Sequence, residues 1–191
     1  MRERYLRVRE EVGPGVTVVA ATKYVSLEDM SMLADAGVEV VGENRAQDLL
    51  AKHAAYGGAF RWHFIGHLQS RKAPVVNETC ELCHSLGSES AARKLRIPAL
   101  VEVNLSGEPT KSGVPPELLP HLLELYPDVR GLMTMPPATD DPEASRPWFR
   151  RLRQLAERHG LRELSMGTSQ DYRVAAEEGA TYVRVGSVLW A

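Results

Sequence analysis

The sequence has few cysteines, no long apolar run and no excess of charge of either sign. Cys80 and Cys83 are the two cysteines in 191 residues, too few for a disulfide scaffold. No window approaches the roughly 18 apolar residues that a membrane helix needs. The N-terminal stretch MRERYLRVRE lacks the apolar core of a secretory signal. We therefore expect a cytoplasmic protein with no membrane partner.

The charge and the length are those of an ordinary globular domain. Lys and Arg number 23 against 25 Asp and Glu, a formal net charge of −2, which gives no reason to expect a nucleic-acid partner. Dividing the length by about 150 residues per domain gives roughly one domain. Because no composition break marks a second unit, we expect a single domain over residues 1–191.

Short apolar or β-branched runs alternate with helical patterns along the chain. The runs that predict strands cover residues 16–21, 38–41, 61–65, 81–85, 99–105, 129–133, 161–166 and 181–185. Between them, Ser26 with Asp29 is a candidate capping box, Ser145 is a candidate helix cap, and a helix is expected from Gln170. Eight such units favour an α/β fold of the closed (β/α)8 TIM-barrel type, with an open doubly wound sheet as the alternative.

Lys23 is the first of two features that point to a binding site. The active face of a parallel barrel lies at the carboxyl ends of its strands, and Lys23 directly follows the first predicted strand. A lysine in a desolvated barrel mouth loses part of its preference for the ammonium form, and the neutral amine attacks an aldehyde to give a Schiff base. The alternative is that Lys23 extends from a strand end into solvent.

The second feature is a pair of turns rich in Gly and Ser, MGTSQD after the seventh strand and GS after the eighth. Barrels often bind phosphate there through backbone N–H groups, hydroxyls and a helix N-terminus. Ser169 is expected at such an N-terminus, with an ordinary helix cap as its alternative role. Gly186 permits close approach of a ligand, or is a simple turn glycine. A lysine opposite a phosphate-binding turn is the layout that a pyridoxal phosphate site needs.

Six stretches of the sequence carry a family resemblance. They read AATKYVS, GENRAQDLL, WHFIGHLQSRK, VEVNLSGEPTKSGV, GLMTM and LSMGTSQDYRVAAEEGATYVRVGS. On these stretches the chain resembles the pyridoxal phosphate homeostasis protein family over nearly its whole length. The resemblance implies a barrel similar to the N-terminal domain of alanine racemase, with pyridoxal 5'-phosphate (PLP) as the cofactor.

The resemblance also implies roles for individual residues. It places the Schiff base on Lys23 and an arginine facing the pyridine nitrogen at Arg184. The phosphate-binding positions fall on Ser169 and on the backbone N–H groups of Gly186 and Ser187. Thr168 is an additional hydroxyl, and Asn44 is expected near the cofactor ring. The expected cofactor-binding residues are therefore Lys23, Asn44, Ser165, Thr168, Ser169, Arg184, Gly186 and Ser187, with no catalytic residue and no metal ligand.

An arginine at the ring nitrogen gives a weak electron sink, with which a racemase still works if paired bases on opposite ring faces transfer the protons; without a second base, cofactor binding with little turnover is expected. PLP enzymes use the protonated pyridine as an electron sink, whereas Arg184 stays charged and cannot accept a proton. The second base of alanine racemase, a tyrosine from a C-terminal domain, is expected to be absent. We expect a non-catalytic monomer that functions in PLP homeostasis, with PLP-dependent apo-enzymes as candidate recipients. The alternative is a small PLP-dependent amino-acid racemase or another Schiff-base enzyme.

The stretch from Cys80 to His84 spells C-x-x-C-H, the attachment pattern of c-type haem. Haem attachment of this type needs export, and the pattern lies where a barrel strand is expected, so we interpret both cysteines as structural. His63 and His67 are four residues apart, but Gly66 and the strand-like run argue against a shared metal. We expect His63 in the core and His67 at the barrel mouth.

Overall fold

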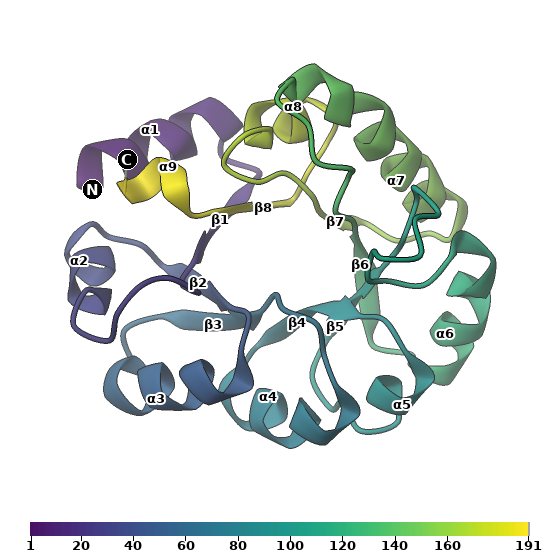
Figure 1. The fold of residues 1–191 in the computed structure, drawn as a ribbon, viewed down its shortest axis with the longest axis horizontal. Coiled ribbons are helices and arrows are strands. Elements are labelled where there is room, and N and C mark those ends of the chain that lie inside the picture. The colour runs from purple at the N-terminus through teal and green to yellow at the C-terminus, as the bar shows by residue number, and fades with distance from the viewer. Residues whose placement is uncertain (191) are drawn as a thin grey trace.

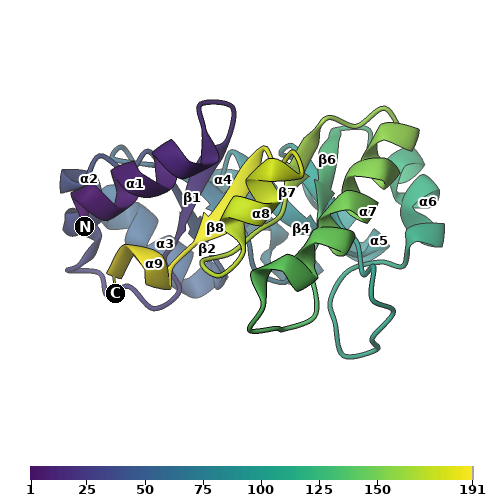
Figure 2. The ribbon, with the colours of Figure 1, turned by 90° about the horizontal axis from the view of Figure 1, so that it is seen from above.

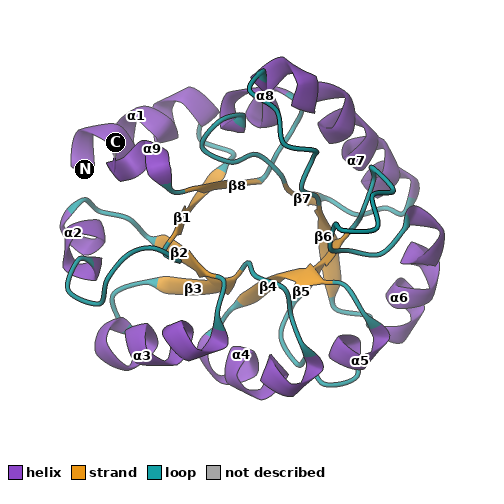
Figure 3. Cartoon of the chain, viewed as in Figure 1, coloured by secondary structure: helices purple, strands orange, loops and turns teal. Residues whose placement is uncertain are grey.

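Eight parallel strands form a closed barrel in chain order (Figures 1 and 3). The computed structural model describes residues 1–190. The strands are β1 (Thr17–Ala21), β2 (Val40–Glu43), β3 (Arg61–Phe64), β4 (Leu82–Leu86), β5 (Ala99–Glu102), β6 (Val129–Met133), β7 (Glu163–Ser165) and β8 (Tyr182–Val185). β8 pairs with β1, for example through Arg184 and Val19. This pairing confirms the closed barrel and excludes the open sheet.

Helices cover the outside of the barrel (Figure 1). They are α1 (Arg2–Val12), α2 (Met30–Asp35), α3 (Ala46–Tyr56), α4 (Ala73–Thr79), α5 (Glu89–Ala92), α6 (Leu119–Leu125), α7 (Arg146–Arg158), α8 (Tyr172–Glu177) and α9 (Ser187–Trp190), with short 3-10 helices η1 (Ser70–Lys72), η2 (Pro116–Leu118) and η3 (Pro142–Ser145). α9 contacts α1, so both ends of the described chain lie on the same side of the barrel (Figure 2). None of these helices combines the length and the apolar character needed to cross a membrane.

The strands are buried on both faces, which explains their continuous apolar sequences. The outward-facing side chains of the strands pack against the surrounding helices. On the helix side of this contact, Phe149 and Leu152 of α7 are fully buried. Inward-facing positions alternate with these along each strand. Leu82, Leu100 and Met133 form a separate apolar cluster of buried residues with Tyr182 packed against it.

The sequence predicts the helix boundaries less accurately than the strand boundaries. α8 begins at Tyr172 rather than at the expected Gln170, and its N-cap residue is Asp171. Ser26 does accept a hydrogen bond from the Asp29 N–H at 3.1 Å, but α2 begins after this turn, at Met30. Ser145 is the N-cap residue of α7, as expected, but its side chain makes no capping hydrogen bond. The 3-10 helix η3 runs directly into α7, so the chain before Ser145 is already helical and the capping side chain is that of Asp141.

Candidate functional site

A cavity of about 850 Å³ opens at the carboxyl ends of the strands. This volume lies within the usual range for small-molecule sites. Seven of the eight predicted residues line it: Lys23, Asn44, Thr168, Ser169, Arg184, Gly186 and Ser187. The eighth, Ser165, is fully buried in the barrel interior next to Arg184 and does not line the cavity. The closed barrel therefore brings together residues from both ends of the sequence.

Lys23 lies in the turn after β1 and is exposed. Its Nζ sits 4.7 Å from the centre of the Tyr24 ring, an arrangement in which the ring face attracts the ammonium group. Tyr24 itself is 88% exposed at the rim. Of the two roles considered for Lys23, the desolvated position is wrong and the extension into solvent is confirmed, because the β1–α2 turn leaves the side chain exposed. The amine remains in the cavity lining, within reach of both solvent and ligand.

A buried ion pair fixes the backbone at the ends of the neighbouring strands β1 and β2, beside the cavity. Lys52 of α3 contacts the Glu43 carboxylate at 2.7 Å and donates to the carbonyl of Thr22 at 2.7 Å. Glu43 also accepts hydrogen bonds from the Thr22 hydroxyl at 2.7 Å and from the Asn44 N–H at 2.9 Å. Thr22 precedes Lys23 and Glu43 precedes Asn44, so one ion pair positions both lining residues.

Asn44 presents an unpaired acceptor. Its Oδ1 is buried and has no hydrogen-bond partner within residues 1–190. Gly66 allows close approach of the Asn44 backbone, because a Cβ on Gly66 would lie 2.0 Å from the Asn44 carbonyl oxygen. Buried polar atoms in native proteins are normally satisfied. Asn44 Oδ1 therefore suits a ligand hydroxyl, such as the one that PLP carries on its ring.

The two turns rich in Gly and Ser meet at Ser169. Its Oγ accepts hydrogen bonds from the N–H groups of Gly186 at 2.9 Å and Val188 at 3.4 Å, so it joins the β7–α8 turn to the β8–α9 turn. The alternative role of Ser169 as the cap of α8 is wrong, because that position belongs to Asp171. Asp171 in turn holds the Thr168 N–H at 2.7 Å. Backbone N–H groups and hydroxyls gathered in this way suit an anion such as a phosphate.

Arg184 is a buried cation without a carboxylate partner. Its Nη1 donates to Ser165 Oγ, and its Nη2 donates to the Thr134 carbonyl at 3.1 Å and to Met135 Sδ. These bonds use three of the five N–H donors of a guanidinium, and within the described residues no other protein group accepts from it. Burial lowers the pKa of Arg184 to about 10, which leaves the group charged at neutral pH. Its remaining donors are available to a ligand in the cavity.

Glu102 is a lining residue that the sequence analysis missed. The residue is 6% exposed, and within residues 1–190 its carboxyl group makes no ion pair or side-chain hydrogen bond. Burial raises its pKa against the opposing charges of Arg184 and His67. The predicted strand extended to residue 105, so the sequence did not show that Glu102 is the last inward-facing residue of β5. His67 does line the mouth, as expected.

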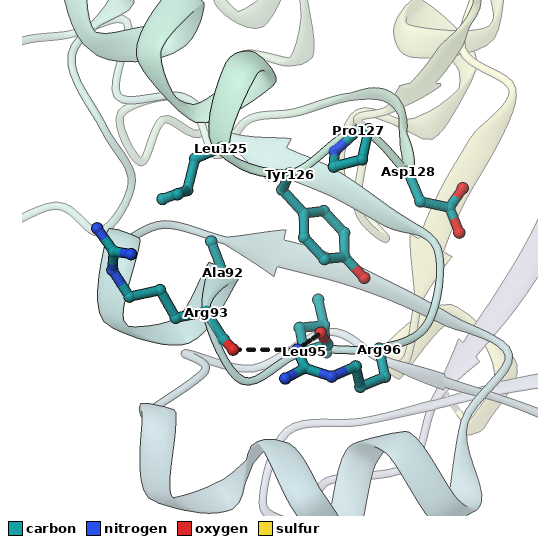
Figure 4. A pocket seen from close by; sticks show the side chains of 8 residues that line it. All are labelled: Ala92, Arg93, Leu95, Arg96, Leu125, Tyr126, Pro127 and Asp128. Atoms are coloured by element: carbon teal, nitrogen blue, oxygen red, sulfur yellow. Dashed lines mark hydrogen bonds between the residues drawn. The ribbon is translucent and has the colours of Figure 1, made fainter.

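Other sequence features lie away from the cavity. Cys80 and Cys83 are buried, and burial raises their pKa values to about 12 and about 11, which suits inert structural thiols. A second, more open cavity of about 510 Å³ lies between the ends of α5 and α6 (Figure 4). There Arg96 donates to the carbonyls of Arg93 and Leu95, and none of the predicted site residues takes part.

Comparisons with known proteins agree with the geometry. The family model for the alanine racemase N-terminal domain matches residues 1–191. The pyridoxal phosphate homeostasis protein of Aquifex aeolicus is 39% identical, over 98% of this chain and 93% of that protein. The protein of the same name from Deinococcus radiodurans is 40% identical, over 92% of this chain and 89% of that protein.

Solved structures share the fold. PipY of Synechococcus elongatus, in its form with PLP bound, superposes with a TM-score of 0.87 at 30% identity and covers 100% of this chain and 99% of PipY. Alanine racemase of Corynebacterium glutamicum gives a TM-score of 0.74 at 14% identity, over 99% of this chain and 59% of the racemase. At that identity the second likeness concerns the fold alone.

Removal of one partner of the buried ion pair should destabilise the protein. Lys52→Met leaves the Glu43 carboxylate buried without its counter-charge, so we expect the free energy of unfolding to fall by about 3–5 kcal/mol. The double variant Glu43→Gln/Lys52→Met carries neither charge and should recover most of this loss. Urea unfolding measures both, with Lys94→Ala as an exposed control. Equal stability of Lys52→Met and the control would contradict a structural role for the pair.

The raised pKa of Glu102 predicts a pH-dependent cost to stability. Its contribution to folding is fully present below the ordinary pKa of 4.5 and is lost as the pH rises through the raised value. Glu102→Gln should therefore increase the free energy of unfolding at neutral pH, and this gain should vanish in acid. Denaturant unfolding at several pH values tests this, with the exposed Glu124→Gln as control. A neutral-pH loss in Glu102→Gln would show that the carboxylate stabilises the fold.

Proposed function

Since the chain belongs to the pyridoxal phosphate homeostasis protein family, with the fold of the alanine racemase N-terminal domain, we propose that it binds PLP as a Schiff base on Lys23 and serves PLP homeostasis with little or no turnover. One observation carries this proposal. A single cavity is lined by an accessible lysine amine, by an anion-binding pair of turns and by a buried arginine.

Lys23 supplies the covalent attachment. It is the one lysine among the described residues that line the cavity, although the sequence has five. Its amine attacks the aldehyde carbon of PLP, the C=N bond forms, and the aldehyde oxygen leaves as water. The buried Glu43–Lys52 pair holds the backbone just before Lys23, so the amine starts from a fixed position.

The phosphate end is held by the joined turns. The N–H groups of Gly186 and Ser187 and the hydroxyls of Thr168, Ser169 and Ser187 supply donors at one side of the cavity. Ser169 Oγ accepts from the Gly186 N–H, and a bound phosphate would accept hydrogen bonds from that N–H and from the Ser169 hydroxyl. Charge-assisted hydrogen bonds of this kind are among the stronger ones in proteins.

Arg184 and Asn44 contact the ring of the cofactor. PLP, when bound, supplies an electron sink whose strength depends on protonation of its pyridine nitrogen. The Arg184 guanidinium is charged and can only donate, so the nitrogen facing it stays unprotonated. Asn44 Oδ1, which is buried without a hydrogen-bond partner among the described residues, would accept from the ring hydroxyl. A ring held in this state stabilises a carbanion poorly, which supports a holding role over catalysis.

The open mouth suits a protein that binds and releases its cofactor. Lys23 and Ser187 are exposed at the rim, and Tyr24 projects beside them. Small molecules can therefore reach the attachment point without opening the barrel. We infer that PLP leaves through this mouth, with PLP-dependent apo-enzymes as the candidate recipients, and that a monomer suffices for this role.

One observation favours the alternative, a small amino-acid racemase or another Schiff-base enzyme. Glu102 places a titratable carboxyl group in the cavity wall, on the strand opposite β1 across the eight-stranded barrel. Perturbed carboxyl groups in cavities are frequent acid/base catalysts. Together with the Lys23 amine it would supply the pair of proton-transfer groups that such a reaction needs.

Lys23→Ala should abolish the visible absorption of the PLP-loaded protein, because no imine forms without the amine. Phosphate contacts remain, so this variant should still bind PLP, more weakly, in equilibrium dialysis. Lys94→Ala, which changes an exposed lysine outside the cavity, should keep the spectrum of the unaltered protein. A visible band that survives in Lys23→Ala would place the attachment on another lysine.

PLP-loaded protein should racemise and transaminate amino acids no faster than free PLP. The reason is that the unprotonated ring beside Arg184 is a weak electron sink for a carbanion. Chiral chromatography of L-alanine incubated with the protein measures racemisation, and keto-acid formation measures transamination. Rapid turnover that disappears in Glu102→Gln would establish the enzyme alternative instead.

A further inference from the structure

A chain of four polar side chains runs from the cavity into the barrel interior. Arg184 Nη1 is hydrogen-bonded to Ser165 Oγ, which lies 2.7 Å from Nδ1 of His84. Nε2 of His84 lies 2.9 Å from Nδ1 of His63. The four residues come from β8, β7, β4 and β3, and none is more than 6% exposed. The family resemblance concerns Arg184, whereas neither histidine was predicted to have a role in the site.

The Arg184 guanidinium, at the cavity end of this chain of hydrogen bonds, determines where each proton lies. A guanidinium only donates, so Ser165 Oγ accepts from Arg184. Ser165 Oγ has one further partner within residues 1–190, the His84 ring, and its own proton must go there. Nδ1 of His84 is then an acceptor and Nε2 carries the hydrogen, which it donates to Nδ1 of His63. The reverse arrangement would leave the buried Ser165 hydroxyl proton without an acceptor, which is costly.

Burial keeps both rings neutral, as this order of protons requires. It lowers the pKa of His63 to about 3, helped by the charge of Arg61. It also lowers the pKa of His84 well below its usual value, with smaller contributions from His63 and Arg184. The two neutral rings can therefore continue the chain of hydrogen bonds from Ser165 without adding a charge to the barrel interior.

We propose that Ser165 and His84, supported by His63, are positioning residues that orient the Arg184 guanidinium toward the cavity through neutral acceptors alone. A carboxylate in their place would hold Arg184 equally firmly but would cancel its charge. Each donor in the chain strengthens the next acceptor, so Ser165 Oγ holds the guanidinium better than an isolated hydroxyl would. The consequence for PLP rests on the proposed function: the guanidinium, which is hydrogen-bonded to no carboxylate of residues 1–190, acts with its charge on the pyridine nitrogen.

The proton order is tested first in the cofactor-free protein. Nitrogen NMR of the histidine rings, assigned with His84→Asn and His63→Asn, should show both residues as neutral Nε2–H tautomers at neutral pH. A ring that carries its hydrogen on Nδ1 in His84, or a charged ring at either position, would overturn the proposal. This measurement does not depend on PLP.

The positioning role is tested with PLP. His84→Leu keeps the bulk of the ring but offers no acceptor to Ser165, whereas His84→Asn retains an amide oxygen near the place of Nδ1. We expect His84→Leu to weaken PLP binding about tenfold or more and to shift the visible band of the loaded protein, and His84→Asn to restore much of both. Cys83→Ala, on the outer face of the same strand, alters packing but no bond of the chain, and should leave the band unchanged.

Ser165→Ala removes the hydroxyl oxygen that accepts from Arg184, with a smaller change of volume, and it decides the question if His84→Leu does not fold. Folded variants with unchanged affinity and an unchanged band would overturn the positioning role. A different outcome would concern the proposed function alone: if even the unaltered protein neither binds PLP nor shows a visible band, PLP is not the ligand. The tautomer measurement would then still report whether the chain of hydrogen bonds orients Arg184.

Discussion

Pairing of β8 with β1 is the constraint on which the rest of the structure depends. It places Arg184 beside Val19 in register, and the Cα of Gly186 lies so near β1 that an added Cβ would sit 3.7 Å from that of Ala21. Residues about 160 positions apart in the sequence thereby face one cavity. Without closure, the amine after β1 and the anion-binding turn after β8 would lie at opposite edges of an open sheet, and neither alone would form a site.

The barrel contains two kinds of buried charge. One kind stabilises the fold, and the other lines the cavity. Glu43 and Lys52 neutralise each other and hold the ends of β1 and β2. Arg184 is hydrogen-bonded to neutral acceptors only, and Glu102 makes no ion pair or side-chain hydrogen bond among the described residues, although both are buried, both line the cavity and their opposite charges attract. Buried charges without a directly paired counter-charge cost stability. Such groups are retained where a ligand supplies the missing interaction, which is why the chemistry concentrates at this end of the barrel.

The sequence predicts the strands and the residue types of the site well, because a strand buried on both faces leaves a continuous apolar run and parallel strands align their carboxyl ends. The sequence does not predict the contacts between segments that lie far apart along the chain. The exposure of Lys23 depends on the path of one turn, and Ser169 joins two turns instead of capping a helix. Ser165 lies behind Arg184 because alternation along a short strand turns it inward. Glu102 and His84 were missed for the same reason: only the closed barrel shows which side chains converge inside it.

The central claim is that one amine among five lysines reacts with the cofactor. Its most direct test is reduction of the PLP-loaded protein with borohydride, followed by proteolysis and mass spectrometry of the peptides. The account predicts one labelled lysine, Lys23, at near-stoichiometric yield, because it alone among the lysines lines the cavity with the anion-binding turns. A label spread over Lys72, Lys94 and Lys111, or no label at saturating PLP, would contradict it.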